Sequence, residues 1–354
     1  MALVVIMAAA LWGVGMAMGT PRRMRWAMIG FLWLGVVLLH LVLPAGNPLR
    51  LATGESAAPW LLLGGGAALV WVYRQGLRRL RARADGPPSD DAVPAAKGKF
   101  SETELNRYAR HIVLREIGGT GQRKLKDARV LVIGAGGLGS PALMYLAASG
   151  VGTIGVIDGD VVEGSNLQRQ VIHTDDRIGM PKVFSAEAAM KALNPFIDVR
   201  PYNRRLTPDI ATDLFADYDL ILDGTDNFET RYLANEVAHR LGKPLVSGAL
   251  SQWEGQLSVF DTASGTPCYR CIFPEPPAAG LAPTCAEAGV FAPLPGIVGT
   301  MMAGEAVKLI TGAGETLRGT MLIHDALYSD TRRITLKKHA DCPVCGATAE
   351  ETST

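Results

Sequence analysis

The chain has 354 residues, enough for one large domain and additional segments. Its 35 basic and 34 acidic residues give a net charge of +1, which excludes a strong overall attraction to nucleic acid. The charge is unevenly placed, because the first 80 residues contain a single acidic residue, Glu55. We therefore expect two parts of different character and no nucleic-acid partner.

Three apolar runs without a charged residue lie in the N-terminal part, at residues 3–19, 26–43 and 57–73. An α-helix needs about 20 residues to cross the hydrocarbon core of a bilayer, and each run comes close to that length. We predict a membrane region at residues 1–83 with about three transmembrane helices, and a two-span variant stays open. A cleaved signal peptide is disfavoured, because no basic residue precedes the first apolar run.

Basic residues between the apolar runs predict an orientation in the membrane. Arg22, Arg23 and Arg25 follow the first run, and five arginines from Arg74 to Arg83 follow the third. The positive-inside rule places both flanks in the cytoplasm. We therefore expect a multi-pass protein of the inner (cytoplasmic) membrane, with its catalytic domain in the cytoplasm.

The rest of the chain divides by composition. Residues 84–99 are rich in glycine, proline, serine and aspartate, which is typical of a flexible linker. We assign one soluble domain to residues 100–347 and a short tail to residues 348–354.

A strand, a glycine-rich turn, a helix and a second strand follow one another in the first half of this domain. Arg129–Ile133 is a short β-branched run, residues 134–139 read Gly-Ala-Gly-Gly-Leu-Gly, and Thr153–Ile157 leads to Asp158. The order is typical of a Rossmann-type nucleotide site, where glycines let the backbone approach phosphates and a helix N-terminus donates hydrogen bonds. By itself the pattern would equally suit an NAD-dependent dehydrogenase.

The predicted fold is α/β, with a doubly wound, mostly parallel, Rossmann-like sheet. Strands at residues 256–260, 320–324 and 333–336 are expected to extend this sheet in the antiparallel direction. The full prediction is this domain preceded by about three transmembrane helices.

Cations near the predicted nucleotide site favour chemistry at a phosphate. Arg169 follows the second strand, and Lys182 opens the next helical segment. Hydride transfer needs no such pair, whereas charge that develops on phosphoryl oxygens must be neutralised by cations and Mg²⁺. Asp226 follows another predicted strand and is a candidate Mg²⁺ ligand, because hard oxygen donors suit this ion.

Six motifs occur in an order that resembles one protein family. They are Arg107-Tyr-Ala-Arg110, the glycine-rich turn with Ser140, Ser165-Asn-Leu-Gln-Arg-Gln170, Asp223-Gly-Thr-Asp-Asn227, Cys268-Tyr-Arg-Cys271 and Cys342-Pro-Val-Cys345. The ordered set, spanning residues 101–346, resembles the MoeB/ThiF (HesA/MoeB/ThiF) family, relatives of the ubiquitin-activating enzymes. Within this family it is most similar to the molybdopterin-synthase adenylyltransferases.

The resemblance implies a role for each matched residue. Contacts with ATP would come from Gly137, Asp158, Ser165, Arg169, Lys182, Asp226 and Asn227. Arg169 and Lys182 would lie at the reacting phosphates, and Asp226 would hold Mg²⁺. Arg110 resembles an arginine that the family donates to the partner subunit's site, which implies a homodimer. Each residue also has a plainer alternative as a surface charge or a turn former.

Four of the five cysteines form two CxxC pairs, Cys268/Cys271 and Cys342/Cys345. In a chain whose catalytic part is expected inside the cell, such pairs favour a metal over disulfides. Four thiolates suit tetrahedral Zn²⁺ and leave no position for water, so the zinc would be structural. The alternative is four reduced thiols in turns.

The fifth cysteine, Cys285, lies in a proline- and glycine-rich segment. Some members of the family resemble this pattern and use a cysteine here for a covalent link to the carrier. Such reactivity needs a depressed thiol pKa, and a small buried cysteine is the alternative. The candidate catalytic residues are therefore Arg169, Lys182, Asp226, Arg110 and Cys285.

The resemblance implies a nucleotidyltransferase that adenylates the C-terminal glycine carboxylate of a ubiquitin-like sulfur-carrier protein. The favoured carrier is the small subunit of molybdopterin synthase, in molybdenum cofactor biosynthesis. The chain ends at Thr354, so we expect a separate sulfur donor. Three alternatives stay open: the thiamine-pathway sulfur carrier as substrate, a cyclising relative that modifies tRNA, and a non-catalytic, membrane-tethered binding module.

Overall fold

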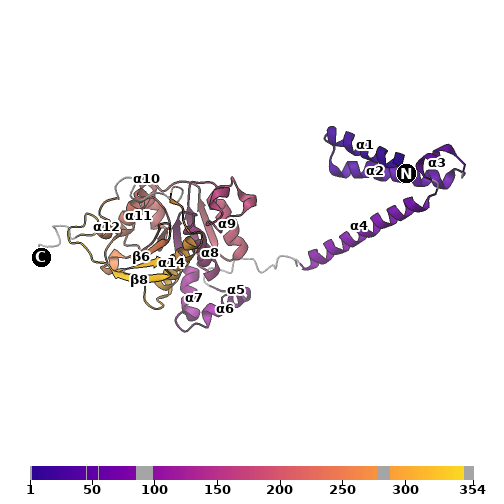
Figure 1. Cartoon of the computed structure of the whole chain (residues 1–354). Helices are drawn as coiled ribbons and strands as arrows, with labels where there is room; N and C mark the ends of the chain where they lie inside the picture. The colour runs from indigo at the N-terminus through magenta and orange to yellow at the C-terminus, as the bar shows by residue number, and fades with distance from the viewer. Residues whose placement is uncertain (1, 45, 55, 85–98, 277–287, 347–354) are drawn as a thin grey trace. The chain divides into compact units, whose positions relative to one another are not determined.

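The computed structural model describes residues 2–44, 46–54, 56–84, 99–276 and 288–346 (Figure 1). The chain divides into two compact units, Met1–Asp90 and Asp91–Thr354. Most of the predicted linker at residues 84–99, the last predicted residue of the domain, 347, and the predicted tail at 348–354 fall outside the described residues. The boundaries of the linker and the tail therefore stay predictions.

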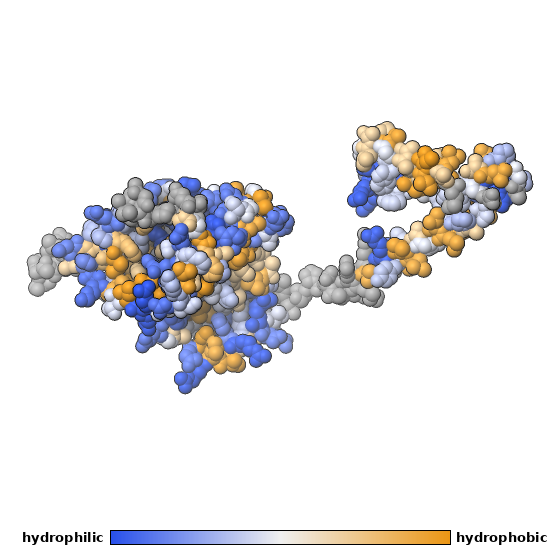
Figure 2. All heavy atoms as spheres, in the orientation of Figure 1, coloured by the Kyte–Doolittle hydropathy of each residue, from blue (hydrophilic) through white to orange (hydrophobic). Residues whose placement is uncertain are grey.

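Four helices form the N-terminal unit. They are α1 (Ala2–Ala17), α2 (Arg22–Val42), α3 (Pro48–Thr53) and α4 (Ala58–Ala84). Trp33 of α2 packs on α4: its indole N–H donates to the carbonyl of Trp60 at 2.8 Å, and a Cβ on Gly64 would lie 2.1 Å from its ring. Many apolar side chains of α1, α2 and α4 remain exposed, and they form the hydrophobic surfaces of this unit in Figure 2.

The expectation of three transmembrane helices is not supported. Within the described part of the chain, α2 is the one helix that is both long and apolar enough to cross a membrane. Helix α1 has 16 residues, about 24 Å at the helical rise, which is shorter than a hydrocarbon core of about 30 Å. Helix α4 is longer, but three successive glycines at residues 64–66 and the arginines from Arg74 onward lower its hydropathy.

One eight-stranded sheet runs through the C-terminal unit in the order β3-β2-β1-β4-β5-β6-β7-β8. The parallel strands are β1 (Arg129–Ile133), β2 (Thr153–Ile157), β3 (Asp198–Tyr202), β4 (Leu220–Asp223) and β5 (Leu245–Leu250). The antiparallel strands are β6 (Glu254–Phe260), β7 (Thr320–Asp325) and β8 (Asp330–Thr335). The predicted α/β fold with a mixed sheet is confirmed. Strand β8 begins three residues before the predicted start. All of its side chains are exposed, so no alternation of buried and exposed residues marks its first residue in the sequence.

Helices cover both faces of this sheet. The longer ones are α7 (Gly118–Asp127), α8 (Gly139–Ser149), α9 (Lys182–Leu193), α10 (Pro208–Ala216), α11 (Phe228–Arg240) and α14 (Pro293–Thr311). Shorter helices are α5 (Glu102–Arg107), α6 (Ala109–Ile112) and α12 (Tyr269–Ile272). Side chains of β1 alternate between two hydrophobic clusters: Val130 and Val132 pack with α8 and α14, and Leu131 and Ile133 pack with α10 and α11. Burial on both faces explains why residues 130–133 of β1 are all apolar instead of alternating with polar residues.

Glycines allow α8 and α14 to pack closely at the end of β1. A Cβ on Gly139 would lie 1.9 Å from the carbonyl oxygen of Gly134, so no side chain fits at the start of α8. A Cβ on Gly299 of α14 would lie 2.3 Å from the carbonyl oxygen of Leu138. These contacts fix α14 against the glycine-rich turn.

Gly299→Ala is expected to destabilise the C-terminal unit by about 1–3 kcal/mol, because the added methyl group must displace the backbone of Leu138. The matched control is Gly304→Ala on the same helix, where no neighbouring segment comes within 4 Å of the added Cβ. That control should stabilise the helix by about 0.5–1 kcal/mol. Denaturant unfolding followed by circular dichroism measures both changes, and equal midpoints for the two variants would contradict the close packing.

Candidate functional site

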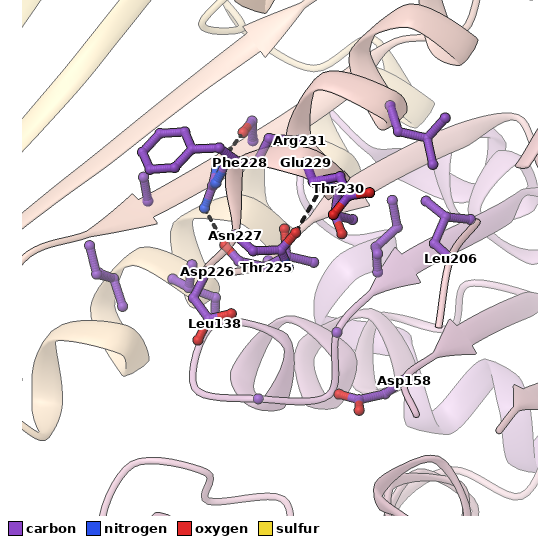
Figure 3. Close-up of a pocket in the computed structure, with 18 of the residues that line it drawn as sticks. Leu138, Asp158, Leu206, Thr225, Asp226, Asn227, Phe228, Glu229, Thr230 and Arg231 are labelled. Atoms are coloured by element: carbon purple, nitrogen blue, oxygen red, sulfur yellow. Dashed lines mark hydrogen bonds between the residues drawn. The ribbon is translucent and has the colours of Figure 1, made fainter. Parts of the chain in front are cut away.

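A cavity lies where the strand order of the sheet reverses. Strand β1 pairs with β2 on one side and with β4 on the other, so the crossover helices leave in opposite directions. Open α/β sheets bind ligands outside the carboxyl ends of such strands. A cavity of about 1000 Å³ occupies this place, and Figure 3 shows part of its lining.

The glycine-rich turn and Asp158 form one wall of this cavity. Gly134 has a φ of +92°, which favours glycine, and Gly136 and Gly137 line the cavity. One carboxylate oxygen of Asp158 accepts from the backbone N–H of Ala135 at 2.8 Å, and the other accepts from the N–H of Asp160 at 2.8 Å. Each oxygen keeps a free lone pair. The carboxylate is therefore held in place and can still accept from ribose hydroxyl groups.

A buried histidine, His173, is hydrogen-bonded to the backbone of the glycine-rich turn. The Nε2 atom of His173 lies 2.9 Å from the carbonyl oxygen of Ala135, and its Nδ1 atom lies 2.9 Å from the hydroxyl of Ser185. A carbonyl can only accept, so Nε2 carries the hydrogen. Burial lowers the pKa of His173 below its ordinary value, which keeps the ring neutral. This role was not predicted, because a single histidine without ligand spacing belongs to no motif.

Two predicted cations, Arg169 and Lys182, line the same cavity. Lys182 is the first residue of α9 and is buried, and its ammonium group donates to Asp160 at 2.9 Å. Arg169 donates to the side-chain oxygen of Asn166 at 2.7 Å. The partner Asp160 was not predicted, because nothing in its sequence neighbourhood indicates a contact 22 residues away. Both cations are held by short contacts in positions suited to an anionic ligand.

Asp226 and Asn227 also line the cavity, and they lie in the turn between β4 and α11 (Figure 3). Asn227 is the N-cap of α11, where its side chain accepts from the N–H of Thr230 at 2.9 Å. Asp226 is exposed in the turn before the cap. An exposed carboxylate in the cavity lining suits Mg²⁺, which binds through few protein oxygens and keeps several waters. The donor set therefore fits a magnesium–nucleotide complex.

Two predicted residues, Ser165 and Arg110, are not part of the cavity lining. Ser165 lies in a short 3₁₀ helix, Gly164–Asn166, whose neighbour Arg169 reaches the cavity instead. Arg110 is exposed on α6, away from the cavity of its own chain. Cys285 lies outside the described residues.

The four paired cysteines come together as predicted. Their Sγ atoms all lie within 4.8 Å of one another, and all four residues are buried. The Cys268–Cys342 and Cys271–Cys345 sulfur distances are 3.6 Å and 3.3 Å. A tetrahedral zinc ion with Zn–S bonds of about 2.3 Å needs sulfurs about 3.8 Å apart, and a disulfide needs about 2.05 Å. The cluster could therefore hold zinc, which would tie the C-terminal segment to α12.

Fold and cavity together define a nucleotide-binding α/β protein of the doubly wound class, with a separate cysteine cluster. A sequence model described as "ThiF family" matches residues 108–344. The chain belongs to the ThiF family.

Several relatives carry names that describe an activity. The chain is 49% identical over 252 residues to "Sulfur carrier protein adenylyltransferase" of Thermus thermophilus, covering 70% of this chain and 93% of that protein. It is 48% identical over 244 residues to "SAMP-activating enzyme E1" of Haloferax volcanii, covering 69% of this chain and 90% of that protein. It is 53% identical over 247 residues to "Probable adenylyltransferase/sulfurtransferase MoeZ" of Mycobacterium tuberculosis, covering 69% of this chain and only 63% of that protein.

Solved structures share the fold. MccB of E. coli, in a crystal structure with ATP, matches with a TM-score of 0.58 and 25% identity, covering 68% of this chain and 74% of that chain. A second structure of E. coli MccB, with MccA-N7isoASN, matches with a TM-score of 0.60 and 24% identity, covering 70% of this chain and 76% of that chain.

We expect one zinc ion per chain by elemental analysis of the purified protein. Cys345→Ser removes one of four thiolates, so the variant should lose the ion and unfold about 5 °C lower or more. Cys285→Ser is the matched control and should keep both the zinc and the melting temperature. Wild-type protein that contains no zinc after growth in zinc-supplemented medium would contradict the assignment.

Proposed function

We propose that this chain is an adenylyltransferase that activates the C-terminal carboxylate of a ubiquitin-like sulfur-carrier protein. The observation that carries the proposal is the convergence of Arg169, Lys182 and Asp226 around a glycine-rich turn in one cavity. The names of the Thermus and Mycobacterium relatives support the same reaction class. The MccB structure with ATP supports ATP as the nucleotide.

The cavity suggests how its residues would act on ATP. Backbone N–H groups at the start of α8 would bind phosphate oxygens, and Asp158 would hold the ribose. The carrier carboxylate, already ionised at pH 7, attacks the α-phosphorus and needs no general base. A bond from carboxylate oxygen to phosphorus forms, the α–β phosphoanhydride bond breaks, and the products are an acyl adenylate and pyrophosphate. Arg169 and Lys182 would neutralise charge that develops on the phosphoryl oxygens.

Mg²⁺ bound at Asp226 would supply further charge neutralisation between the phosphates and orient the leaving pyrophosphate. The contribution of the chain itself is to position these groups in advance. Zinc at the cysteine cluster would play no part in this step, because four thiolates leave no open position.

The finer assignments are part of the proposal. We favour the small subunit of molybdopterin synthase as the carrier, with the thiamine-pathway carrier as the alternative. Arg110 is exposed and away from its own cavity, as an arginine that completes a partner subunit's site in a homodimer would be. The adenylate would then accept sulfur from a donor, and Cys285 stays a candidate for a covalent step.

Attachment to a membrane is a further part of the proposal. Helix α2 is long and apolar enough to span a bilayer, and exposed apolar side chains also cover α1 and α4. The five arginines from Arg74 to Arg83, on the side of the adenylating unit, favour the cytoplasmic side for that unit. We therefore propose the inner (cytoplasmic) membrane as the location.

ATP–pyrophosphate exchange that depends on a carrier is expected for the full chain in detergent. Arg169→Ala should lower kcat/KM for exchange by about 100–1000-fold, because one group that stabilises phosphoryl charge is lost. Arg200→Ala, an exposed arginine on β3, is the control and should leave exchange unchanged. Testing the molybdopterin-type and thiamine-type carriers side by side names the pathway. No exchange with either carrier would shift the assignment to a cyclising relative or a binding module.

The chain is expected to stay in the membrane fraction after an alkaline carbonate wash and to be released by detergent. Replacing two exposed residues of α2 in one variant, Phe31→Lys and Leu38→Lys, should release it, since each charge costs about 2.5–3.5 kcal/mol at the centre of a span. Leu327→Lys, at an exposed apolar position of the C-terminal unit, should not. Wild-type protein in the soluble fraction of its own cells would contradict the location.

A further inference from the structure

A buried arginine, Arg231, is hydrogen-bonded to the turn that carries Asp226. Arg231 lies in the first turn of α11, and only 5% of its surface is exposed although it borders the cavity. A buried guanidinium group must be paired and hydrogen-bonded, because its desolvation is costly. Nothing in the sequence analysis assigned it a role.

The guanidinium group of Arg231 joins α11 to the turn that precedes it and to β5. It donates to the hydroxyl of Ser247 at 3.1 Å and to the carbonyl of Gly248 at 2.7 Å, both on β5. It also donates to the carbonyl of Thr225 in the turn, and Figure 3 places its side chain against that turn. A planar group with a fixed fork of donors can hold three carbonyl or hydroxyl oxygens at once, whereas a lysine ammonium group acts as a point charge.

Asp223 completes the arrangement from the end of β4. Its carboxylate is fully buried, and one oxygen accepts from both the N–H and the hydroxyl of Thr225, at 3.0 Å and 2.7 Å. The other oxygen lies 3.5 Å from the guanidinium group of Arg231. The backbone of Thr225 is therefore held on both sides: its N–H donates to Asp223, and its carbonyl accepts from Arg231.

These contacts restrict the backbone on both sides of Asp226. The preceding residue, Thr225, is held by Asp223 and Arg231, and the following residue, Asn227, is held as the cap of α11. Asp226 itself is exposed, so its carboxylate direction depends on the backbone that carries it. A metal ligand held by such supporting contacts binds more tightly than one on a free turn.

We propose that Arg231 is a positioning residue, which together with Asp223 orients Asp226 toward the metal ion of a metal–ATP complex. The proposal rests on the adenylation function for the identity of the ligand. Arg231 does not contact the nucleotide in this account; it acts through the carbonyl of Thr225. Arg231 also neutralises the negative charge of Asp223. Asp226 is then the carboxylate of this turn that can bind the metal ion.

The test is Mn²⁺ binding to the full chain in detergent, measured by electron paramagnetic resonance. The sample contains a saturating ATP analogue that cannot be cleaved between the α and β phosphates. In Arg231→Lys the charge opposite Asp223 is kept, but one ammonium group cannot hold Thr225, Ser247 and Gly248 together. We expect the Kd for Mn²⁺ to rise about 10–100-fold, with little change in melting temperature. Arg240→Lys, at the exposed end of the same helix, is the control and should match wild type.

A second variant covers the case in which a lone buried charge prevents folding. The double change Asp223→Asn with Arg231→Met removes both charges together, so no unpaired ion is left in the protein. It should fold and show the same loss of Mn²⁺ affinity. An unchanged Mn²⁺ Kd in folded Arg231→Lys and in the folded double variant would overturn the proposal, as would a loss of stability with no change in metal binding.

Exchange kinetics separate this proposal from the adenylation function. In Arg231→Lys the Mg²⁺ concentration for half-maximal exchange should rise, while the KM for the carrier stays at the wild-type value. If wild type catalyses no exchange but Mn²⁺ affinity still falls in the variant, adenylation fails and the positioning role stands. If exchange is normal and the metal dependence is unchanged, the positioning role fails alone.

Discussion

Backbone contacts that leave no room for side chains hold the nucleotide site together. A Cβ on Gly139 would lie 1.9 Å from the carbonyl of Gly134, and one on Gly299 would lie 2.3 Å from that of Leu138. Gly224, after β4, would place a Cβ 3.2 Å from Leu138. The ends of β1 and β4 and the starts of α8 and α14 therefore meet at a point where only backbone fits. Because strand order also reverses here, the site opens beside this point, with the N-terminus of α8 facing it.

Charges around the site differ in how firmly they are held. Asp223 and Arg231 form a buried pair that neutralises itself and shapes the turn. Lys182 is buried with a single carboxylate partner, Asp160, which is itself half exposed. Asp226 is exposed beside the cavity. The cavity lining includes the carboxylates of Asp158 and Asp226 and the cations Arg169 and Lys182. This set of charges suits a metal–nucleotide complex and a reaction at phosphorus.

The sequence predicted the features that are encoded by short motifs, whose residues are close together along the chain. The turn after β1, the acid after β2 and the CxxC pairs are short motifs, and the structure gathers them as expected, although their roles in the reaction stay predictions. It missed Asp160, His173 and Arg231, because each acquires its role only through contacts between distant segments. The three predicted spans failed for a different reason: an apolar run of suitable length can form a helix that is too short, as α1 is, or too rich in glycine, as α4 is.

Transfer of an adenylyl group to a carrier's C-terminus would add a fixed mass to the carrier. The intact mass of each candidate carrier can be measured after incubation with the full chain, ATP, Mg²⁺ and an inorganic pyrophosphatase. One carrier should gain the mass of a single adenylyl group, and the same carrier without its terminal glycine should gain none. Carriers that stay at their original mass, under conditions where the chain demonstrably binds ATP, would contradict this transfer.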